Sequence, residues 1–346
     1  SNHIQMSYYF MFVILFFVGA YFEDAYKKKE LPHFFKASGV LALAAVVGVC
    51  INISNLYHTY EYSKETMRGK SELKQEGAAA SQTSSGLDRD YITNWSYGIG
   101  ETLTLLVPNV KGGGSGSTMS QSEAAMAKAN PMYNGIYSQL PQYFGEQPWT
   151  AGPVYVGAFV MFLFVLGCFI VKGPLKWALL GATIFSILLS WGKNFMGLTD
   201  FFIDYVPMYN KFRAVSSILV IAEFTIPLLA IFALKEILSK PDMLKQEKNC
   251  RGVIAALVLT AGVALILAVA PGTFFSSFIT TQEMTALKQA LPAEHLAPFV
   301  ANLTEMREAI IASDAWRSFF IIVIGCLFLF LYQLRKLKAS FTLAGI

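Results

Sequence analysis

The sequence predicts an all-α membrane protein, a polytopic bundle of about seven transmembrane helices whose extracytoplasmic loops contain amphipathic helices. Of its 346 residues, 54% are hydrophobic and only 14% are charged, whereas a soluble domain carries about 25% charged residues. The apolar residues gather in runs that approach the roughly 20 residues needed to cross a bilayer core. These runs are too long and too uniform for barrel strands. Helices are therefore expected, because they satisfy their own backbone hydrogen bonds in lipid.

Seven apolar runs are expected to span the membrane. They are residues 7–22, 37–53, 151–171, 177–191, 214–234, 252–270 and 316–334. The fourth run is short, so we expect its flanking residues to snorkel or the bilayer to thin around it. All seven are assigned to one membrane domain that covers residues 1–346.

The positions of Lys and Arg predict which way the spans run. The connectors after the first, third and fifth runs and the tail after the seventh are short and basic, as expected on the cytoplasmic side. The N-terminus of the chain is then outside and its C-terminus cytoplasmic. Residues 55–150 form a large extracytoplasmic loop, residues 271–314 form a second one, and residues 190–213 form a short one between them.

The two larger outer loops have distinct expected structures. In the first, a polar helical arm after residue 55 is followed by a Ser- and Ala-rich flexible stretch at residues 75–85 and by the run GGGSGS at residues 112–117, which is expected to be flexible. In the second, apolar residues recur at helical spacing, which predicts amphipathic helices at the outer membrane–water boundary. These residues are Met284, Leu287, Leu291, Phe299, Leu303, Met306 and Ile310.

The strongest candidate binding site is the loop at residues 190–213, SWGKNFMGLTDFFIDYVPMYNKFR. Lys193 and Arg213 flank this loop, next to the ends of two spans, where Arg offers a planar fork and Lys a point charge to a phosphate. Asn194 lies in the same loop and is a further candidate, and Tyr205 and Tyr209 are candidate stacking platforms for a sugar. The alternative is that the cations anchor helix ends among lipid head groups, with the aromatic residues forming an interfacial belt.

A second aromatic segment precedes the glycine run, and its Trp95 is a candidate platform for a sugar ring. Glu101 in this segment and His3 before the first span are the candidate catalytic residues. A helix-capping or solvated Glu and a polar helix-end His are the alternatives. Glu223 lies within the fifth run, where a carboxylate is a functional candidate or a neutral or paired buried group.

Other classes of function are not supported by the residue pattern. The four cysteines lack metal-ligand spacing, and the four histidines form no zinc motif. No metal site and no cofactor are therefore predicted, although a requirement for a divalent metal stays open. The basic residues follow the membrane-flanking connectors rather than one face of a domain, so no nucleic acid is expected as a partner.

Several motifs together resemble one family. NHIQM before the first span, SGLDRDYITNWSYGIGETLTLLVPN before the glycine run, and SWGKNF with YVPMYNKFRAVS are similar to the YfhO-like membrane proteins of Bacteroidetes-type bacteria. These proteins are similar in turn to the GT-C glycosyltransferases, multi-span enzymes that use a polyprenyl-phosphate-linked sugar at the outer face of the cytoplasmic membrane.

The resemblance carries several expectations. It implies a bacterial inner-membrane protein whose partners are the lipid bilayer, a polyprenyl-phosphate-linked sugar donor and an acceptor of unknown identity. It also implies that Arg213 contacts the carrier phosphate. The catalytic acid of GT-C enzymes follows the first span of the whole protein, so this chain is expected to be an internal piece that begins downstream of it. A transporter or flippase of lipid-linked sugars and a non-catalytic envelope scaffold are the alternatives.

Overall fold

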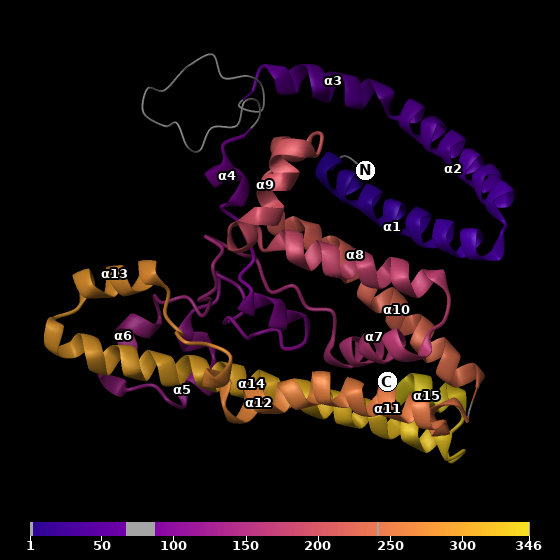
Figure 1. The fold of residues 1–346 in the computed structure, drawn as a ribbon. Helices are drawn as coiled ribbons and strands as arrows, with labels where there is room; N and C mark the ends of the chain where they lie inside the picture. Colours follow the sequence, from indigo (N-terminus) through magenta and orange to yellow (C-terminus); the bar gives the residue numbers. More distant parts are fainter. Residues whose placement is uncertain (1–2, 67–86, 241, 346) are drawn as a thin grey trace. The chain divides into compact units, whose positions relative to one another are not determined.

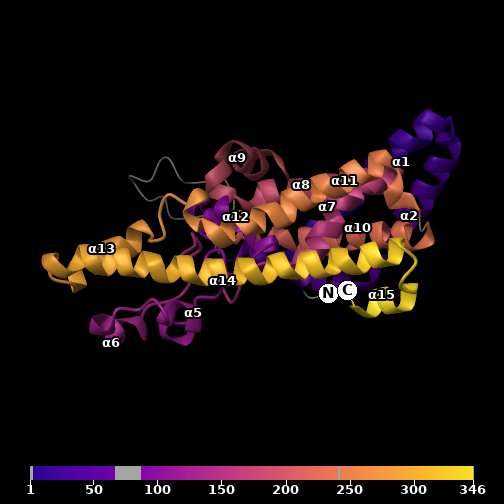
Figure 2. The ribbon, with the colours of Figure 1, turned by 90° about the horizontal axis from the view of Figure 1, so that it is seen from below.

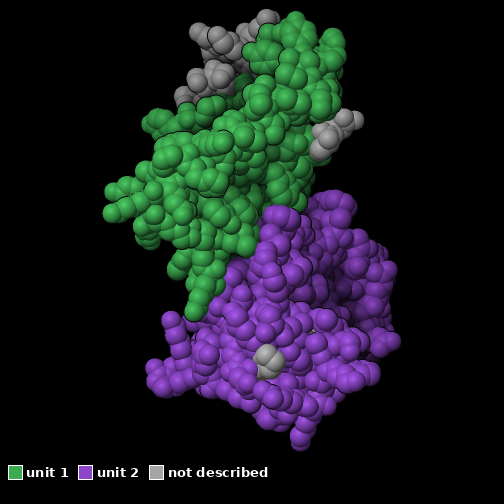
Figure 3. Space-filling model, turned by 90° about the vertical axis from the view of Figure 1, so that its right-hand side faces the viewer, with its two compact units in different colours: residues 1–97, 172–222 green, residues 98–171, 223–346 purple. Residues whose placement is uncertain are grey.

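The described residues of the computed structural model, 3–66, 87–240 and 242–345, form helices and a single isolated β-bridge, and no strand. The all-α prediction is therefore confirmed. The chain divides into two compact units, drawn in two colours in Figure 3. The first unit consists of Ser1–Tyr97 and Lys172–Ala222, and the second of Gly98–Val171 and Glu223–Ile346.

Five helices in the described part of the chain are long and apolar enough to cross a membrane. A sixth is added if the bent pair Pro174–Ser190 and Gly192–Tyr205 counts as one span. The third predicted run contains only the 13-residue helix α7 (Ala158–Ile170). At 1.5 Å per residue it is about 20 Å long, shorter than the roughly 30 Å of a bilayer core. The chain is thus multi-pass by the length and composition of its helices, and the count of seven remains a prediction.

The first unit begins with two long helices, α1 (Ile4–Lys28) and α2 (Leu31–Ile51), joined by a tight turn. Lys29 adopts a left-handed conformation with φ 60°, and the N–H of Glu30 bonds to the carbonyl of Ala25 at 2.8 Å. This pattern closes the end of α1. After Asn52 the short helix α3 (Ile53–Lys64) follows α2. The predicted flexible stretch at residues 75–85 lies outside the described residues.

Helix α8 (Pro174–Ser190) packs along α1, as Figure 1 shows. Phe12 and Phe16 of α1 contact Phe185 of α8, with ring centroids 5.1 and 5.5 Å apart. Gly181 lets the helices approach, because a Cβ there would lie 3.0 Å from the Phe16 ring. This aromatic seam forms part of the core of the first unit.

The chain turns by 108° between α8 and the segment that contains α9 (Met196–Tyr205). Gly192 makes the turn possible. Its φ is +48°, and a Cβ would meet the Ser96 hydroxyl oxygen at 2.1 Å, so no larger side chain fits. Beyond α9, the 3-10 turns Tyr209–Lys211 and Val215–Leu219 lead into α10 (Val220–Ser239).

The second unit contains a membrane part and a loop-rich part joined by one helix. Its apolar helices are α7, most of α10, α11 (Glu247–Leu257) and α12 (Val263–Val269), the last two separated by the π-helical turn Val258–Gly262. Helix α14 (Ala293–Gln333) has 41 residues, which makes it about 60 Å long. That is twice a bilayer core. A short helix, α15 (Ala339–Gly345), ends the described chain.

The N-terminal part of α14 packs against protein, and Figure 2 shows α13 (Thr281–Ala290), α5 (Glu123–Met126) and α6 (Asn134–Tyr137) around it. The predicted helical period is confirmed, since Phe299, Leu303 and Met306 are fully buried. Their partners include Met119, Tyr133 and Tyr137. This apolar stripe is therefore covered by other parts of the second unit, and the position of these helices at the membrane boundary remains a prediction.

The glycine run is part of this packed region, contrary to the predicted flexible link. Gly112 and Gly113 have φ of +83° and +82°. A Cβ on Gly112 would stand 1.9 Å from the Gln142 carbonyl oxygen, and one on Gly113 would stand 2.7 Å from the Asn109 side chain. Glycine is used here for a left-handed turn and close backbone contact rather than for flexibility.

Candidate functional site

In the first unit, α4 (Arg89–Thr93) and the short segment that follows it contact both ends of the predicted binding loop. Arg213 donates a hydrogen bond from Nη1 to the Tyr91 hydroxyl at 2.8 Å. Its guanidinium carbon lies 5.9 Å from the Tyr91 ring centroid and 5.8 Å from that of Trp95. Both distances are within the range of cation–π attraction. The structure thus brings two of the predicted residues, Arg213 and Trp95, into one cluster with Tyr91.

The backbone of Arg213 is also held in place. Gln5 in the first turn of α1 donates from Nε2 to the Arg213 carbonyl at 2.7 Å and to the Tyr9 hydroxyl at 2.9 Å. The next residue, Ala214, has a left-handed φ of 58°, and the Ser216 N–H bonds to the Trp95 carbonyl at 3.1 Å. The guanidinium remains exposed, so a fixed main chain presents it to the surroundings.

The other end of the loop is attached to the same segment. The Lys193 N–H donates to the Ser96 hydroxyl at 2.8 Å, and the Asn194 amide donates from Nδ2 to the Tyr97 carbonyl at 3.0 Å. The Lys193 side chain is exposed. Lys193 and Asn194 therefore contact Ser96 and Tyr97, which stand 97 residues earlier, and Arg213 contacts Tyr91, 122 residues earlier. The sequence could not show this proximity.

The two acidic residues of the predicted loop have a structural partner. Asp200 and Asp204 stand four residues apart on α9 and face Arg89 of α4, which bonds to Asp204 at 2.6 Å and to Asp200. Arg89 is mostly covered, and both carboxylates are partly exposed. Such a fork orients α4 on α9. Apart from the presence of opposite charges, nothing in the residue pattern predicts this pairing.

Tyr205 and Tyr209 differ sharply in exposure. Tyr205 is 75% exposed and lies against Phe201, with ring centroids 5.4 Å apart. Tyr209 is only 2% exposed and packs on Phe202 at 5.5 Å. Burial raises the pKa of the Tyr209 hydroxyl well above its ordinary value. Tyr209 is therefore a core residue, which corrects the expectation that its ring offers a stacking face to a sugar.

The two candidate catalytic residues lie in different units. His3 occupies the N-cap position of α1, where its carbonyl accepts from the Ser7 N–H at 3.2 Å. Glu101 belongs to the second unit and is 2% exposed. Its carboxylate accepts from the Tyr143 hydroxyl at 2.5 Å and from the Gly98 N–H at 2.6 Å. Burial raises the Glu101 pKa. These contacts fit the capping role that was the alternative for Glu101.

The residue pattern missed two cations of the second unit, the partly buried Lys111 and the fully buried Arg307. Burial lowers the pKa of Lys111, and the Arg307 side chain has no exposed surface. For Arg307 a signal existed in the sequence. It stands four residues after Leu303 and three before Ile310, on the apolar stripe of the helix, where a charge predicts a buried ion pair. Lys111, between Val110 and the glycine run, has no comparable signal.

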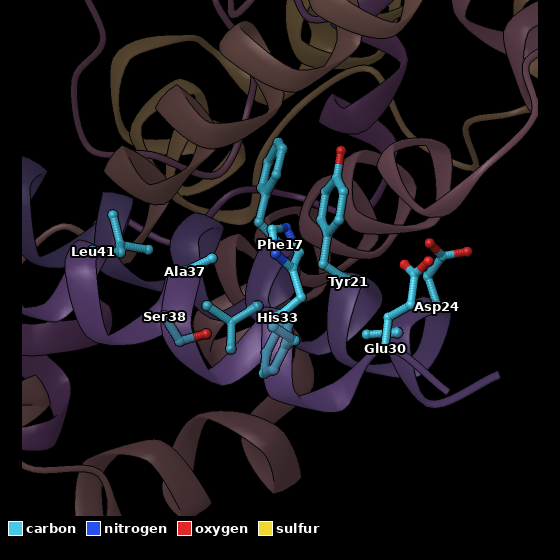
Figure 4. A pocket seen from close by; sticks show the side chains of 11 residues that line it. Phe17, Tyr21, Asp24, Glu30, His33, Ala37, Ser38 and Leu41 are labelled. Carbon is cyan, nitrogen blue, oxygen red and sulfur yellow. The ribbon is translucent and has the colours of Figure 1, made fainter. Parts of the chain in front are cut away.

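A hollow of about 410 Å³ lies in the first unit between α1 and α2. Figure 4 shows its aromatic and ionisable lining, which includes Phe17, Tyr21, Asp24 and His33. Asp24 is engaged by Lys28 at 2.7 Å. The residues around Arg213 do not line this hollow. Across residues 3–66, 87–240 and 242–345, no group of three or more His, Cys, Asp and Glu side chains is placed to hold a metal ion.

Comparison with known proteins found no matching family model, no matching curated protein and no matching solved structure.

Proposed function

We propose that this chain binds a polyprenyl-phosphate-linked sugar at the outer face of a bacterial cytoplasmic membrane, as part of a GT-C-like, YfhO-like glycosyltransferase. The observation that supports this most directly is the exposed Arg213 guanidinium held beside Tyr91 and Trp95. A guanidinium can donate two parallel hydrogen bonds to a phosphate. Oriented in advance, it would stabilise the charge that develops on a leaving phosphate.

The orientation in the membrane belongs to the same proposal. The short basic connectors after the first, third and fifth apolar runs, and the basic tail, are assigned to the cytoplasmic side. The start of the chain and the Arg213 cluster would then lie outside. Arg213 directly precedes the span Val215–Ser239, which would put its guanidinium at the depth of lipid phosphates. Lys193 would add a second positive charge from the other end of the loop. We assign no residue of this chain as the catalytic acid. In the proposed reaction, the sugar is transferred to an acceptor molecule.

The test compares binding to the purified protein by native mass spectrometry. The probes are a polyprenyl-phosphate-linked hexose, the polyprenyl monophosphate and inorganic phosphate. Arg213→Gln should weaken binding of both lipids about 10- to 100-fold, since a hydrogen bond to a charged group contributes about 1.5–3 kcal/mol. Arg251→Gln is the matched control, because Arg251 is an exposed arginine paired with Glu247 in a predicted cytoplasmic connector.

Equal lipid binding by the two variants would show that the lipid does not bind at the Arg213 cluster. Lipid binding that is lost equally in both would show a general charge effect and would also reject the proposal. Binding of inorganic phosphate alone would point to a free anion rather than a lipid carrier.

A second candidate is a transporter of lipid-linked sugars, favoured by Glu223. This residue lies inside the candidate span Val215–Ser239 and its side chain is exposed on the second unit. A carboxylate at membrane depth is a functional candidate. Reconstituted vesicles with a fluorescent lipid-linked sugar would test it. Faster transbilayer movement that Glu223→Gln abolishes would favour transport, and movement equal to that of empty vesicles would reject it.

A further inference from the structure

Lys111 of the second unit lies between two phenylalanine rings. Its Nζ is 4.2 Å from the Phe275 ring centroid and 4.8 Å from that of Phe144. Arg307 approaches the same Phe144 ring at 4.9 Å. The rings remove much of the water around the ammonium and partly replace it by cation–π attraction. The side chain is still partly exposed, so a molecule from outside can reach it.

An ammonium carries three N–H donors, and rings do not satisfy them as oxygen acceptors do. Among the described residues, Lys111 Nζ forms no hydrogen bond and no ion pair, and the Glu101 and Glu146 carboxylates attract it only at longer range. Arg307, its neighbour across Phe144, by contrast donates from both Nη atoms to Glu283 and to two backbone carbonyls, and only its Nε has no partner among the described residues. Water or a bound ligand can therefore supply the acceptors of the Lys111 ammonium.

Two carboxylates border the same short turn. A Cβ on Gly98 would stand 3.0 Å from Glu146 Oε1 and 3.1 Å from Glu101 Oε2, and one on Gly100 would stand 3.8 Å from Lys111 Cε. Glu146 thus lies near Gly98, the first residue of the turn, and Lys111 lies near Gly100, the last. Glu146 is exposed, whereas Glu101 is buried beneath it. An ammonium donor and an accessible carboxylate acceptor therefore flank one three-residue turn.

We propose that this turn is a sugar-binding subsite, in which neighbouring hydroxyl groups accept from Lys111 Nζ and donate to the Glu146 carboxylate. A hydroxyl fits because it donates and accepts at once. An anion would meet Lys111 but would be repelled by Glu146 and Glu101. The class of ligand rests on the proposed function, whereas the location rests on the geometry of the second unit alone.

Glu101 acts here as a positioning residue. Its carboxylate binds the Gly98 N–H and the Tyr143 hydroxyl, and Tyr143 in turn accepts from the Gln147 N–H at 2.9 Å. Gly145 must lack a side chain, because a Cβ would come within 1.9 Å of Glu101 Oε1. These contacts hold the segment that contains Glu146 against the glycine turn.

The test measures the rate at which an acylating reagent modifies Lys111, read by peptide mass spectrometry on the purified chain. The probes are the methyl glycosides of glucose, galactose, mannose and N-acetylglucosamine, with acetate and phosphate as anions. The exposed Lys128 of the same unit is the internal reference. At least one glycoside should slow Lys111 modification threefold or more in a saturable manner and leave Lys128 unchanged. Glu146→Gln, a surface change that preserves folding, should raise the protecting concentration about tenfold.

Protection by acetate or phosphate in place of the glycosides would overturn the proposal in favour of an anion site. Protection by none of the probes would overturn it, and so would protection that Glu146→Gln leaves intact. The Arg213→Gln variant separates this site from the proposed function. It should lose lipid binding and keep glycoside protection of Lys111, so that failure of either proposal is seen independently.

Discussion

Arg307 and Glu283 form a two-pronged ion pair inside the second unit. Both donor–acceptor distances, from Nη1 to Oε2 and from Nη2 to Oε1, are 2.7 Å. Arg307 also donates to the carbonyls of Phe278 at 2.6 Å and Pro141 at 3.3 Å. One side chain of α14 thereby holds α13, the loop before it and the segment at residue 141. A buried charge of this kind is tolerated because several partners compensate it.

Removing one partner of this pair should destabilise the second unit strongly. We expect Glu283→Gln to lower the free energy of unfolding by about 3–5 kcal/mol, because it leaves the Arg307 charge buried and incompletely compensated. Thermal unfolding of the purified protein in detergent measures the effect. Glu247→Gln breaks only the exposed pair with Arg251 and should change little. Equal melting temperatures for the two variants would contradict the stabilising role of the buried pair.

The glycine run should be intolerant of side chains at one position and tolerant at another. Gly112→Ala places a Cβ 1.9 Å from a backbone oxygen at a left-handed φ and should cost about 2 kcal/mol or more. Gly116→Ala is the control, since a Cβ there meets nothing within 4 Å. The ratio of protease cleavage in the two variants reports the difference. A flexible linker would instead tolerate both changes alike.

Stability should depend on pH through Glu101, whose pKa is raised by burial. A raised folded-state pKa means that the folded protein binds the proton more tightly than the unfolded chain. The contribution of this group is complete below its unfolded-state pKa and is lost as the pH rises through its folded-state pKa. Glu101→Gln should therefore flatten the fall in melting temperature above about pH 4.3, the ordinary pKa of a glutamate. An unchanged pH profile would show that Glu101 does not contribute.

Tyr209 offers a test of an unsatisfied buried hydroxyl. Within the described chain its hydroxyl oxygen has no hydrogen-bond partner, so Tyr209→Phe removes a desolvated polar group and should leave stability unchanged or raise it by about 1 kcal/mol. Tyr9→Phe removes an acceptor of the Gln5 amide and should lower stability by a similar amount. Melting temperatures that fall equally in both variants would indicate that the Tyr209 hydroxyl has a partner.

The apolar runs of the sequence predicted the helices because lipid and protein interiors select the same residues. The same pattern could not show where a helix stops. The amphipathic residues from Phe299 to Ile310 and the apolar run from Trp316 form one helix, α14, and Asp314 between them accepts from the Asn109 N–H at 2.8 Å. A charged residue at the junction was compatible with a break, and the contacts of Asp314 with the Asn109 N–H and with Arg317 at 2.5 Å explain its place inside the helix.

The sequence predicted individual residues of the candidate site but not the contacts between them. Arg213 and Trp95 were identified by residue type, but the contact between them depends on the turn at Gly192 and on hydrogen bonds from residues 91–97. Tyr205 and Tyr209 looked alike in the sequence and differ in burial, because one faces outward on α9 and the other fills the core of the first unit. Residue type is visible in the sequence, whereas proximity and burial depend on long-range packing.

The unbroken course of α14 makes it a stiff mechanical link. From Phe299 to Trp316 the helix rises about 25 Å, and over this length it has neither a hinge glycine nor an internal proline. A turn of its lipid-facing half about the helix axis would carry Phe299, Arg307 and the segments clamped to them through the same angle. Rotation of the apolar part of α14 would thus be transmitted to its N-terminal part without any change in secondary structure.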